Sequence, residues 1–310
     1  MAVLVICDYD EARLSPATAR VVNAAKMLGG EIDVLVAGDN VETVANNVAK
    51  LDGVNRVLLA DDASLAHQCA PSVCHLLKGL AKNYTHILAN ANAVGRDVMP
   101  RLAAILDVMP ITDVIKINSA NEFDRPIYAG NAIITVKSNQ AINLLTIRAS
   151  VFNSVAKNNE AKIEKIGVDK IDNLIKFIKA QRTKSDMADL SIAQIVIAGG
   201  QAFESKEEFL LLKKLGKILN APVGATRAAV ELGYSPNETQ IGQSGKIIAP
   251  DLYIAFGISG ALQHLAGIGG AKKIIAINSD ANAPIMKIAD IAMVGDLKII
   301  LPQLIEKLSV

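Results

Sequence analysis

The residues best suited to chemistry lie in the stretch "IGQSGKIIAPDLYIAFGISGALQHLAG" (241–267), where two Gly-Ser clusters flank an apolar run. The segment "GISGAL" follows the run from Leu252 to Phe256 and precedes a helical pattern. Backbone N–H groups at such a helix start would face a ligand above the sheet and could bind a phosphate. A strict G-x-G-x-x-G pattern is missing, because only Gly257 and Gly260 are present, so a strand-helix turn without a ligand remains the alternative.

The loop "GQSGK" at 242–246 resembles a P-loop, but its spacing rejects that interpretation. A Walker A motif needs a glycine five positions before its second glycine, where Gln240 stands, and a Ser or Thr after the lysine, where Ile247 stands. We therefore do not predict an ATPase. The loop could still offer Gln243, Ser244 and backbone amides to a ring or a phosphate, or it could be a plain turn.

Further candidate side chains stand near predicted helix starts. In "GATRAAVELG", Thr226 is a predicted N-cap and Arg227 lies in the first turn, where a cation opposes the helix dipole unless an anionic or electron-rich ligand is present. The alternative is a solvated or ion-paired arginine. His264 could face the same crevice or could be a structural histidine. Asn278 and Asp296 end two later apolar runs, where they could contact a ribose or an adenine or cap the next helices.

Short apolar runs that alternate with amphipathic helical patterns must position these residues. This alternation is typical of a parallel sheet with crossover helices. Ser15-Pro16 predicts a helix start, and Gly29-Gly30 predicts its end. Between residues 111 and 147 the runs are β-rich without intervening helices, which predicts an antiparallel extension or edge of the same sheet. We therefore expect an α/β chain with mostly parallel sheets.

A length of 310 residues fits two domains. Residues 152–189 are polar and lysine-rich, with "AKNNEAKIEK" and "QRTKSDMADL" as linker candidates. We place the boundary near residue 185, so that residues 1–185 form an amino-terminal α/β domain and residues 186–310 a doubly wound domain. In the second domain several apolar runs end in Gly, Asn or Asp, at the strand ends where open α/β sheets bind ligands.

Composition excludes several classes of function. The formal net charge is +1 and no long Lys/Arg block occurs, so we expect no nucleic-acid partner. Three cysteines favour a reducing compartment. The start "MAVLVICDYD" lacks a basic targeting region and the apolar runs are too short to span a bilayer, so we expect no membrane insertion and a bacterial cytoplasmic or a processed protein. The His and Cys residues of "SLAHQCAPSVCHLLKGL" fit no metal-ligand spacing, so we predict no metal site.

Two long strings resemble the flavin-binding signature of the electron transfer flavoprotein alpha subunits: "PVGATRAAVELGYSPNETQIGQSGKIIAPDLYIAFGISGALQHLAG" and "IIAINSDANAPIMKIADIAMVGDL". In the first half, "ANAVGRDVMPRLAAILDVMPITDV" resembles the corresponding family segment, so the resemblance covers essentially the whole chain. It implies FAD in the second domain and a heterodimer with a beta subunit, which the first domain contacts.

The resemblance further implies a redox carrier without substrate turnover of its own. Its donors would be flavin dehydrogenases, such as the acyl-CoA dehydrogenases of fatty acid β-oxidation, and its acceptor a membrane quinone oxidoreductase or another acceptor. The mitochondrial matrix is then the alternative location, for a processed form. The other class of function that we retain is an FAD- or nicotinamide-dependent oxidoreductase with its own small substrate.

Carried over to this sequence, the family's FAD contacts fall on the two Gly-Ser clusters and the strand ends that follow them. These residues are Thr226, Arg227, Ile241, Gly242, Gln243, Ser244, Ser259, Gly260, Ala261, Leu262, Gln263, His264, Asn278, Asp296 and Leu297. Arg227 or His264 would stabilise negative charge on the reduced flavin, and the Ser244 hydroxyl would hydrogen-bond its N5. Gln201 stands where the family commonly has an arginine, which removes a cationic contact.

Overall fold

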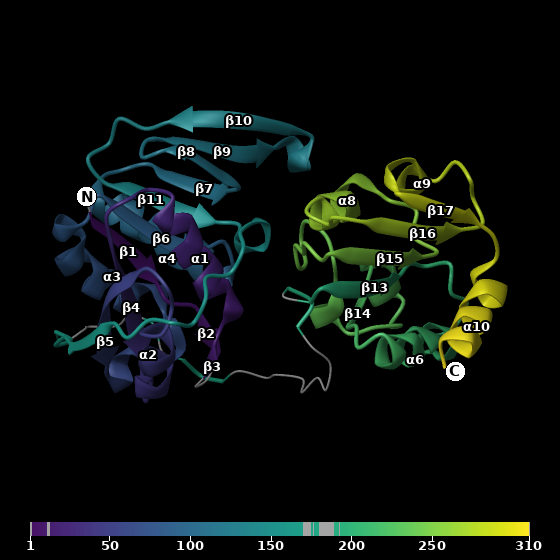
Figure 1. Cartoon of the computed structure of the whole chain (residues 1–310), viewed down its shortest axis with the longest axis horizontal. Helices are drawn as coiled ribbons and strands as arrows, with labels where there is room; N and C mark the ends of the chain where they lie inside the picture. The colour runs from purple at the N-terminus through teal and green to yellow at the C-terminus, as the bar shows by residue number, and fades with distance from the viewer. Residues whose placement is uncertain are drawn as a thin grey trace. The chain divides into compact units, whose positions relative to one another are not determined.

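The computed structural model describes residues 2–10, 13–169, 175, 177–179, 189–191 and 193–309. The chain divides into two compact units, residues 1–181 and 182–310, which Figure 1 shows. The boundary expected near residue 185 lies outside the described residues. Each unit has its own parallel sheet and its own hydrophobic cores.

The described part of unit 1 contains a seven-stranded parallel sheet. In spatial order its strands are β12 (Lys162–Lys165), β5 (Val54–Asp61), β4 (Glu31–Gly38), β1 (Ala2–Ile6), β6 (His86–Asn90), β11 (Asn143–Ile147) and β7 (Pro110–Val114). One face packs against α1 (Pro16–Lys26) and α2 (Glu42–Val48), and the other against α3 (Ala70–Leu80) and α4 (Ala93–Leu106). Strands β2 (Tyr9–Asp10) and β3 (Arg13–Leu14) form a small antiparallel pair.

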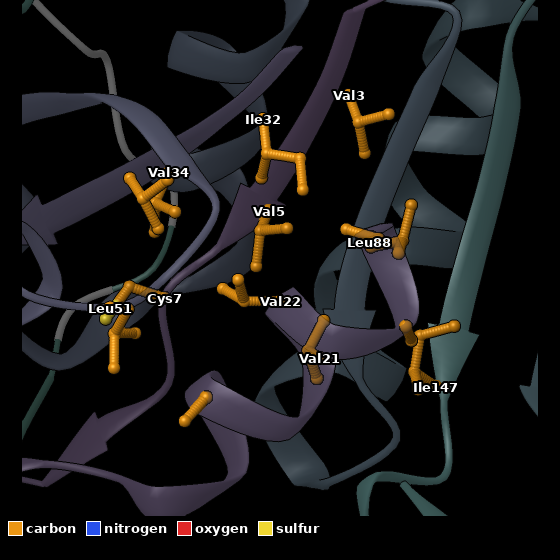
Figure 2. Packing of buried hydrophobic residues seen from close by; sticks show 14 of the residues in the cluster. Val3, Val5, Cys7, Val21, Val22, Ile32, Val34, Leu51, Leu88 and Ile147 are labelled. Carbon is orange, nitrogen blue, oxygen red and sulfur yellow. The ribbon is translucent and has the colours of Figure 1, made fainter. Parts of the chain in front are cut away.

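Burial on both faces explains why β1 has a continuous apolar sequence. Val3 and Val5 belong to the core on the α1 side, where Figure 2 shows Val5 beside Val22 of α1. Leu4 of the same strand belongs to the core on the opposite face. Period-2 alternation distributes such a run between two cores, so a strand buried on both faces has no polar side.

Helix α1 follows its sequence prediction closely. It begins at Pro16, the Ser15 side chain accepts a hydrogen bond from the Ala17 N–H, and Gly29 and Gly30 follow its end with positive φ angles of 72° and 97°. Serine at the cap, proline in the first turn and glycine beyond the last turn each satisfy the backbone requirement of that position.

The β-rich region between residues 111 and 147 differs from its prediction. Strands β8 (Lys116–Ser119), β9 (Glu122–Ile127) and β10 (Ala132–Lys137) are antiparallel as expected, but they form a separate three-stranded sheet. Strands β7 and β11 on either side of them pair in parallel within the main sheet. Adjacent parallel strands need a long crossover, and here a β-meander provides the connection that a helix usually makes.

The stretch "AKNNEAKIEK" is not a linker. It contains β12, which pairs in parallel with β5 at the edge of the sheet, and Arg56 Nη1 lies 2.9 Å from Glu164 Oε2 across that pair. An edge strand can be polar and charged because it has a single neighbour, which is why composition alone suggested a linker. The other linker candidate, 181–190, lies almost wholly outside the described residues.

The described part of unit 2 is a parallel sheet with helices on both faces. In spatial order its strands are β14 (Val223–Ala225), β13 (Ile195–Gly199), β15 (Leu252–Phe256), β16 (Ile274–Asn278) and β17 (Ile291–Val294). Helices α8 (Leu262–Ile268) and α9 (Pro284–Ile288) cover one face. The other face carries α5 (Lys206–Phe209), α6 (Leu211–Ile218), α7 (Arg227–Glu231) and α10 (Leu297–Leu308).

The predicted doubly wound α/β architecture is therefore confirmed. If the five strands of unit 2 are numbered along the chain, their order across the sheet is 2-1-3-4-5. The direction of winding therefore reverses between β13 and β15. The carboxyl ends of the strands at this reversal are the place where such sheets bind ligands. None of the described helices has both the length and the apolar character needed to cross a bilayer.

Candidate functional site

A cavity of about 370 Å³ lies in unit 2 at the carboxyl ends of β13 and β15. Its walls come from the residues after these strands, the first turn of α7, the loop 240–244 and the start of α8. The predicted site residues that line it are Thr226, Arg227, Ile241, Gly242, Gln243, Ser244, Ser259, Gly260, Ala261, Gln263 and His264. Residues from four separate segments thus meet at the reversal of strand order.

Four predicted site residues are not among those that line the cavity. Asn278 donates to the Ile258 carbonyl and Asp296 accepts from the Lys298 N–H, each at 2.8 Å, so they hold a loop and cap a helix. Leu297 is buried in a core, whereas Leu262 is exposed. Contact of these four with the adenosine half of a cofactor stays a prediction.

The glycines of this region serve contacts between backbone segments. A Cβ atom on Gly200 would lie 2.0 Å from the Gly257 carbonyl oxygen, and one on Gly267 would lie 2.5 Å from Gly242 Cα. Gly257 and Gly260 also have positive φ angles, 60° and 83°. The sequence suggested close approach of a ligand, but the closest approaches join the loops that form the cavity walls.

Ser244 is oriented by a neighbour that the sequence analysis missed. The Gln240 side-chain Nε2 lies 3.0 Å from Ser244 Oγ, and both residues line the cavity. Because an amide nitrogen only donates, the serine oxygen accepts this bond and its own hydrogen can be donated to a ligand. Gln240 carries no motif by which sequence reasoning could have found it.

Arg227 is held at the cavity by a carboxylate one helical turn away. Its Nε lies 2.8 Å from Glu231 Oε1, and the two side chains are 73% and 61% exposed. The predicted cap is present, since Thr226 Oγ1 accepts from the Ala229 N–H. An exposed pair of this kind contributes at most about 1 kcal/mol, so an anionic ligand can draw Arg227 away at small cost. Glu231 was not among the predicted site residues, although its position four residues after Arg227 on a predicted helix could have indicated this ion pair.

His264 is buried, and both of its ring nitrogens are engaged. Nδ1 lies 3.1 Å from the Ile241 carbonyl oxygen and Nε2 lies 2.8 Å from the Tyr253 hydroxyl. A carbonyl only accepts, so Nδ1 carries the hydrogen and Nε2 accepts from the tyrosine. Burial lowers the pKa of His264 to about 4, although the bond to Ile241 opposes this shift. His264 is therefore uncharged at neutral pH, which leaves Arg227, the other residue considered for this role, to supply positive charge at the cavity.

This histidine should make the stability of unit 2 depend on pH. Because its folded-state pKa is depressed, its contribution is present above the unfolded value of about 6.5 and is lost as the pH falls toward the folded value. Between about pH 7.5 and about pH 4.5 the free energy of unfolding of unit 2 should fall by about 2–3 kcal/mol more in the wild type than in His264→Gln. Amide hydrogen exchange in β15 and β16 measures this difference.

His264 is the sole histidine of residues 182–310. No other side chain of that region has an ordinary pKa between about 4.5 and about 7.5, so another group would titrate there only if its pKa were strongly shifted. The control is His75→Gln, which removes an exposed histidine of unit 1 and should leave exchange in unit 2 unchanged. Equal pH dependence in the wild type and His264→Gln would contradict the prediction.

The polar groups of the cavity fit FAD. Amides of Gln201, Gln243 and Gln263, the hydroxyl of Ser244 and the guanidinium of Arg227 line it, a donor set suited to flavin heteroatoms and a pyrophosphate. Among the lining residues Arg227 is the one charged cation, because the residue two positions after β13 is the uncharged Gln201 and His264 is neutral. No cluster of three or more potential metal ligands occurs among the described residues.

Comparisons with known proteins also indicate a flavin site in unit 2. Residues 3–171 match the family described as "Electron transfer flavoprotein domain", and residues 189–269 match "Electron transfer flavoprotein FAD-binding domain". The chain is 46% identical to "Electron transfer flavoprotein subunit alpha" of Pseudomonas aeruginosa over 98% of this chain and 99% of that protein. It is 44% identical to the protein of the same name from Paracoccus denitrificans, over 99% and 100%. It is also 44% identical to "Probable electron transfer flavoprotein subunit alpha, mitochondrial" of Caenorhabditis elegans, over 97% and 92%. The chain therefore belongs to the family of electron transfer flavoprotein alpha subunits, and FAD is the cofactor of its second unit.

Proposed function

We propose that this chain is the alpha subunit of a heterodimeric electron carrier that accepts electrons from flavin dehydrogenases, such as acyl-CoA dehydrogenases, and passes them to a membrane quinone oxidoreductase or another acceptor. The supporting observation is that His264, whose ordinary pKa is nearest neutrality among the titratable side chains that line the cavity in the described part of the chain, is buried and has both ring nitrogens hydrogen-bonded, to the Tyr253 hydroxyl and the Ile241 carbonyl. Turnover of a substrate by acid-base chemistry would need such a group to be available.

The cofactor and the protein would have different roles in electron transfer. FAD supplies the electron chemistry when it is bound, and the protein contributes binding, orientation and electrostatics. Arg227 places a positive charge at the cavity, where it would favour a more negative cofactor. The Ser244 hydroxyl would donate to an electron-rich ring atom, and the loop Gly242–Ser244 would fix the ring's position.

The amino-terminal unit would contact the beta subunit. Apolar side chains are exposed on and beside the antiparallel sheet β8–β10, with Tyr128 80% and Ile133 62% exposed. Exposed apolar groups that gather on one element are typical of an interaction surface. The relatives are themselves named as alpha subunits, which implies a second kind of subunit in those proteins.

We place the carrier in the bacterial cytoplasm. Two bacterial relatives share 46% and 44% of their residues with this chain. The nematode relative is named mitochondrial, so the mitochondrial matrix is the alternative for a processed form.

Co-expression with a beta subunit of this family tests the proposed function. The purified protein should be yellow, should release FAD on denaturation and should be reduced when a flavin dehydrogenase and its substrate are supplied together. Absorbance of the bound flavin follows the reduction. Direct turnover of a small-molecule donor by this chain alone would instead identify an oxidoreductase with its own substrate.

A further inference from the structure

Tyr253 is not among the residues that line the cavity, but it hydrogen-bonds His264, which is one of them. It belongs to β15, in the interior of the sheet, and its side chain is 0% exposed. Its surroundings are an apolar core that includes Ile268 and Ile285. Within this core the tyrosine hydroxyl lies 2.8 Å from His264 Nε2. A buried hydroxyl in an apolar core is costly unless it is hydrogen-bonded, so this bond contributes to the order of both side chains.

The two hydrogen bonds of His264 form a chain from the sheet to the wall of the cavity. The Tyr253 hydroxyl donates to Nε2, and Nδ1–H donates to the Ile241 carbonyl. Ile241 immediately precedes the segment Gly242–Ser244, which lines the cavity. We propose that Tyr253 is a positioning residue of the FAD site, which holds His264 in one orientation and thereby fixes the loop Ile241–Ser244 against the cofactor. This inference rests on the proposed function.

The loop needs such a fixed point because glycine occupies its centre. Gly242 has a φ of 147°, where it has no side chain to restrict its backbone. Backbone bonds hold the loop at other points, from Ile241 N–H to Ala225 and from Gln243 N–H to Gln263. The bond from His264 adds the carbonyl of Ile241, so that both polar backbone groups of this residue are fixed immediately before the glycine.

Loss of the Tyr253 hydroxyl would remove the first of the two hydrogen bonds of His264, the one farther from the cavity. Nε2 would then be an acceptor without a donor in an apolar core, and the ring would no longer be held from that side. Rotation of the ring away from this site breaks the bond from Nδ1–H to Ile241. Burial raises the pKa of the Tyr253 hydroxyl, so in the wild type the group keeps its hydrogen and remains a donor.

Tyr253→Phe in the full chain, purified with its partner subunit, tests the inference. We expect the dissociation constant for FAD to rise about fivefold, the effect of losing one buried hydrogen bond. We also expect the ¹⁵N resonance of His264 Nε2 to shift as its donor is lost. The matched control is Tyr84→Phe, which removes a buried hydroxyl bonded to Asp33 in unit 1 and should leave FAD binding unchanged.

A double-mutant cycle establishes whether Tyr253 acts through the histidine. In a His264→Ala background, Tyr253→Phe should have no further effect on FAD binding, whereas additive effects would overturn the inference. His264→Gln is an independent variant, which keeps a partner for the tyrosine hydroxyl and loses the bond to Ile241; it should weaken FAD binding at least as much as Tyr253→Phe, and unchanged binding would overturn the inference. A wild-type protein that retains no FAD would overturn the proposed function and this inference together. FAD binding by Tyr253→Phe equal to that of the wild type would overturn this inference alone.

Discussion

Gly267→Ala should lower the free energy of unfolding of unit 2 by about 2–3 kcal/mol and should weaken FAD binding about tenfold or more. A Cβ atom at this position would lie 2.5 Å from both Cα and N of Gly242. The obstacle is backbone, which cannot rotate away as a side chain can, so α8 and the loop Gly242–Ser244 must separate. Because that loop lines the cavity, one methyl group should affect stability and binding together. Hydrogen exchange in β15 and titration with FAD measure the two effects.

Gly269→Ala is the matched control. This glycine follows the same helix, its φ is −59°, and the nearest atom to an added Cβ would be the Leu265 carbonyl oxygen at 3.7 Å. Alanine fits there without strain and should stabilise unit 2 slightly, through the lower conformational entropy of the unfolded chain. Similar effects of the two substitutions would show that the contact between Gly267 and Gly242 does not shape the cavity.

The sequence predicted the layers of the fold because local signals and burial agree. Ser15, Pro16 and Gly29 each satisfy one backbone requirement of a helix end, so the limits of α1 could be placed to within two residues. Continuous apolar runs such as β1 indicate strands buried on both faces. Strand pairing follows no such local rule, which is why the parallel partnership of β7 and β11 across a meander was missed.

In the candidate site, too, local sequence signals predicted the position of the loops, but contacts between distant residues were not predicted. Glycine and serine clusters at strand ends indicated where the chain turns toward a ligand, and most of these residues line one cavity. The charge of His264 could not be predicted, because it depends on Tyr253 and on the Ile241 carbonyl, both of which reach the ring only through tertiary packing. Gln240 was missed for a different reason: its contact with Ser244, four residues later, depends on the conformation of the turn between them, which no sequence motif specifies.

Arg227→Ala should lower the first reduction potential of the bound FAD. The substitution removes the charged cation at the cavity and leaves the Glu231 carboxylate without its partner, and both changes disfavour added negative charge. His264 cannot compensate, because burial lowers its pKa to about 4. Because the Arg227–Glu231 pair is exposed, we expect its loss to destabilise the reduced flavin by about 1 kcal/mol, which lowers the potential of a one-electron step by roughly 40 mV. Potentiometric titration followed by flavin absorbance measures the shift.

Lys272→Ala separates this local effect from the loss of any surface cation. Lys272 is 72% exposed and lies 2.7 Å from Asp251 Oδ1, so it matches Arg227 in exposure, charge and pairing but does not line the cavity. Its replacement should leave the potential unchanged, since Lys272 does not line the cavity and the charge of an exposed side chain is screened by water and salt. Arg227→Lys should keep most of the wild-type potential, because it preserves the charge. If the holo Arg227→Ala protein has the wild-type potential, this arginine binds the cofactor without tuning it, and backbone dipoles must set the potential instead.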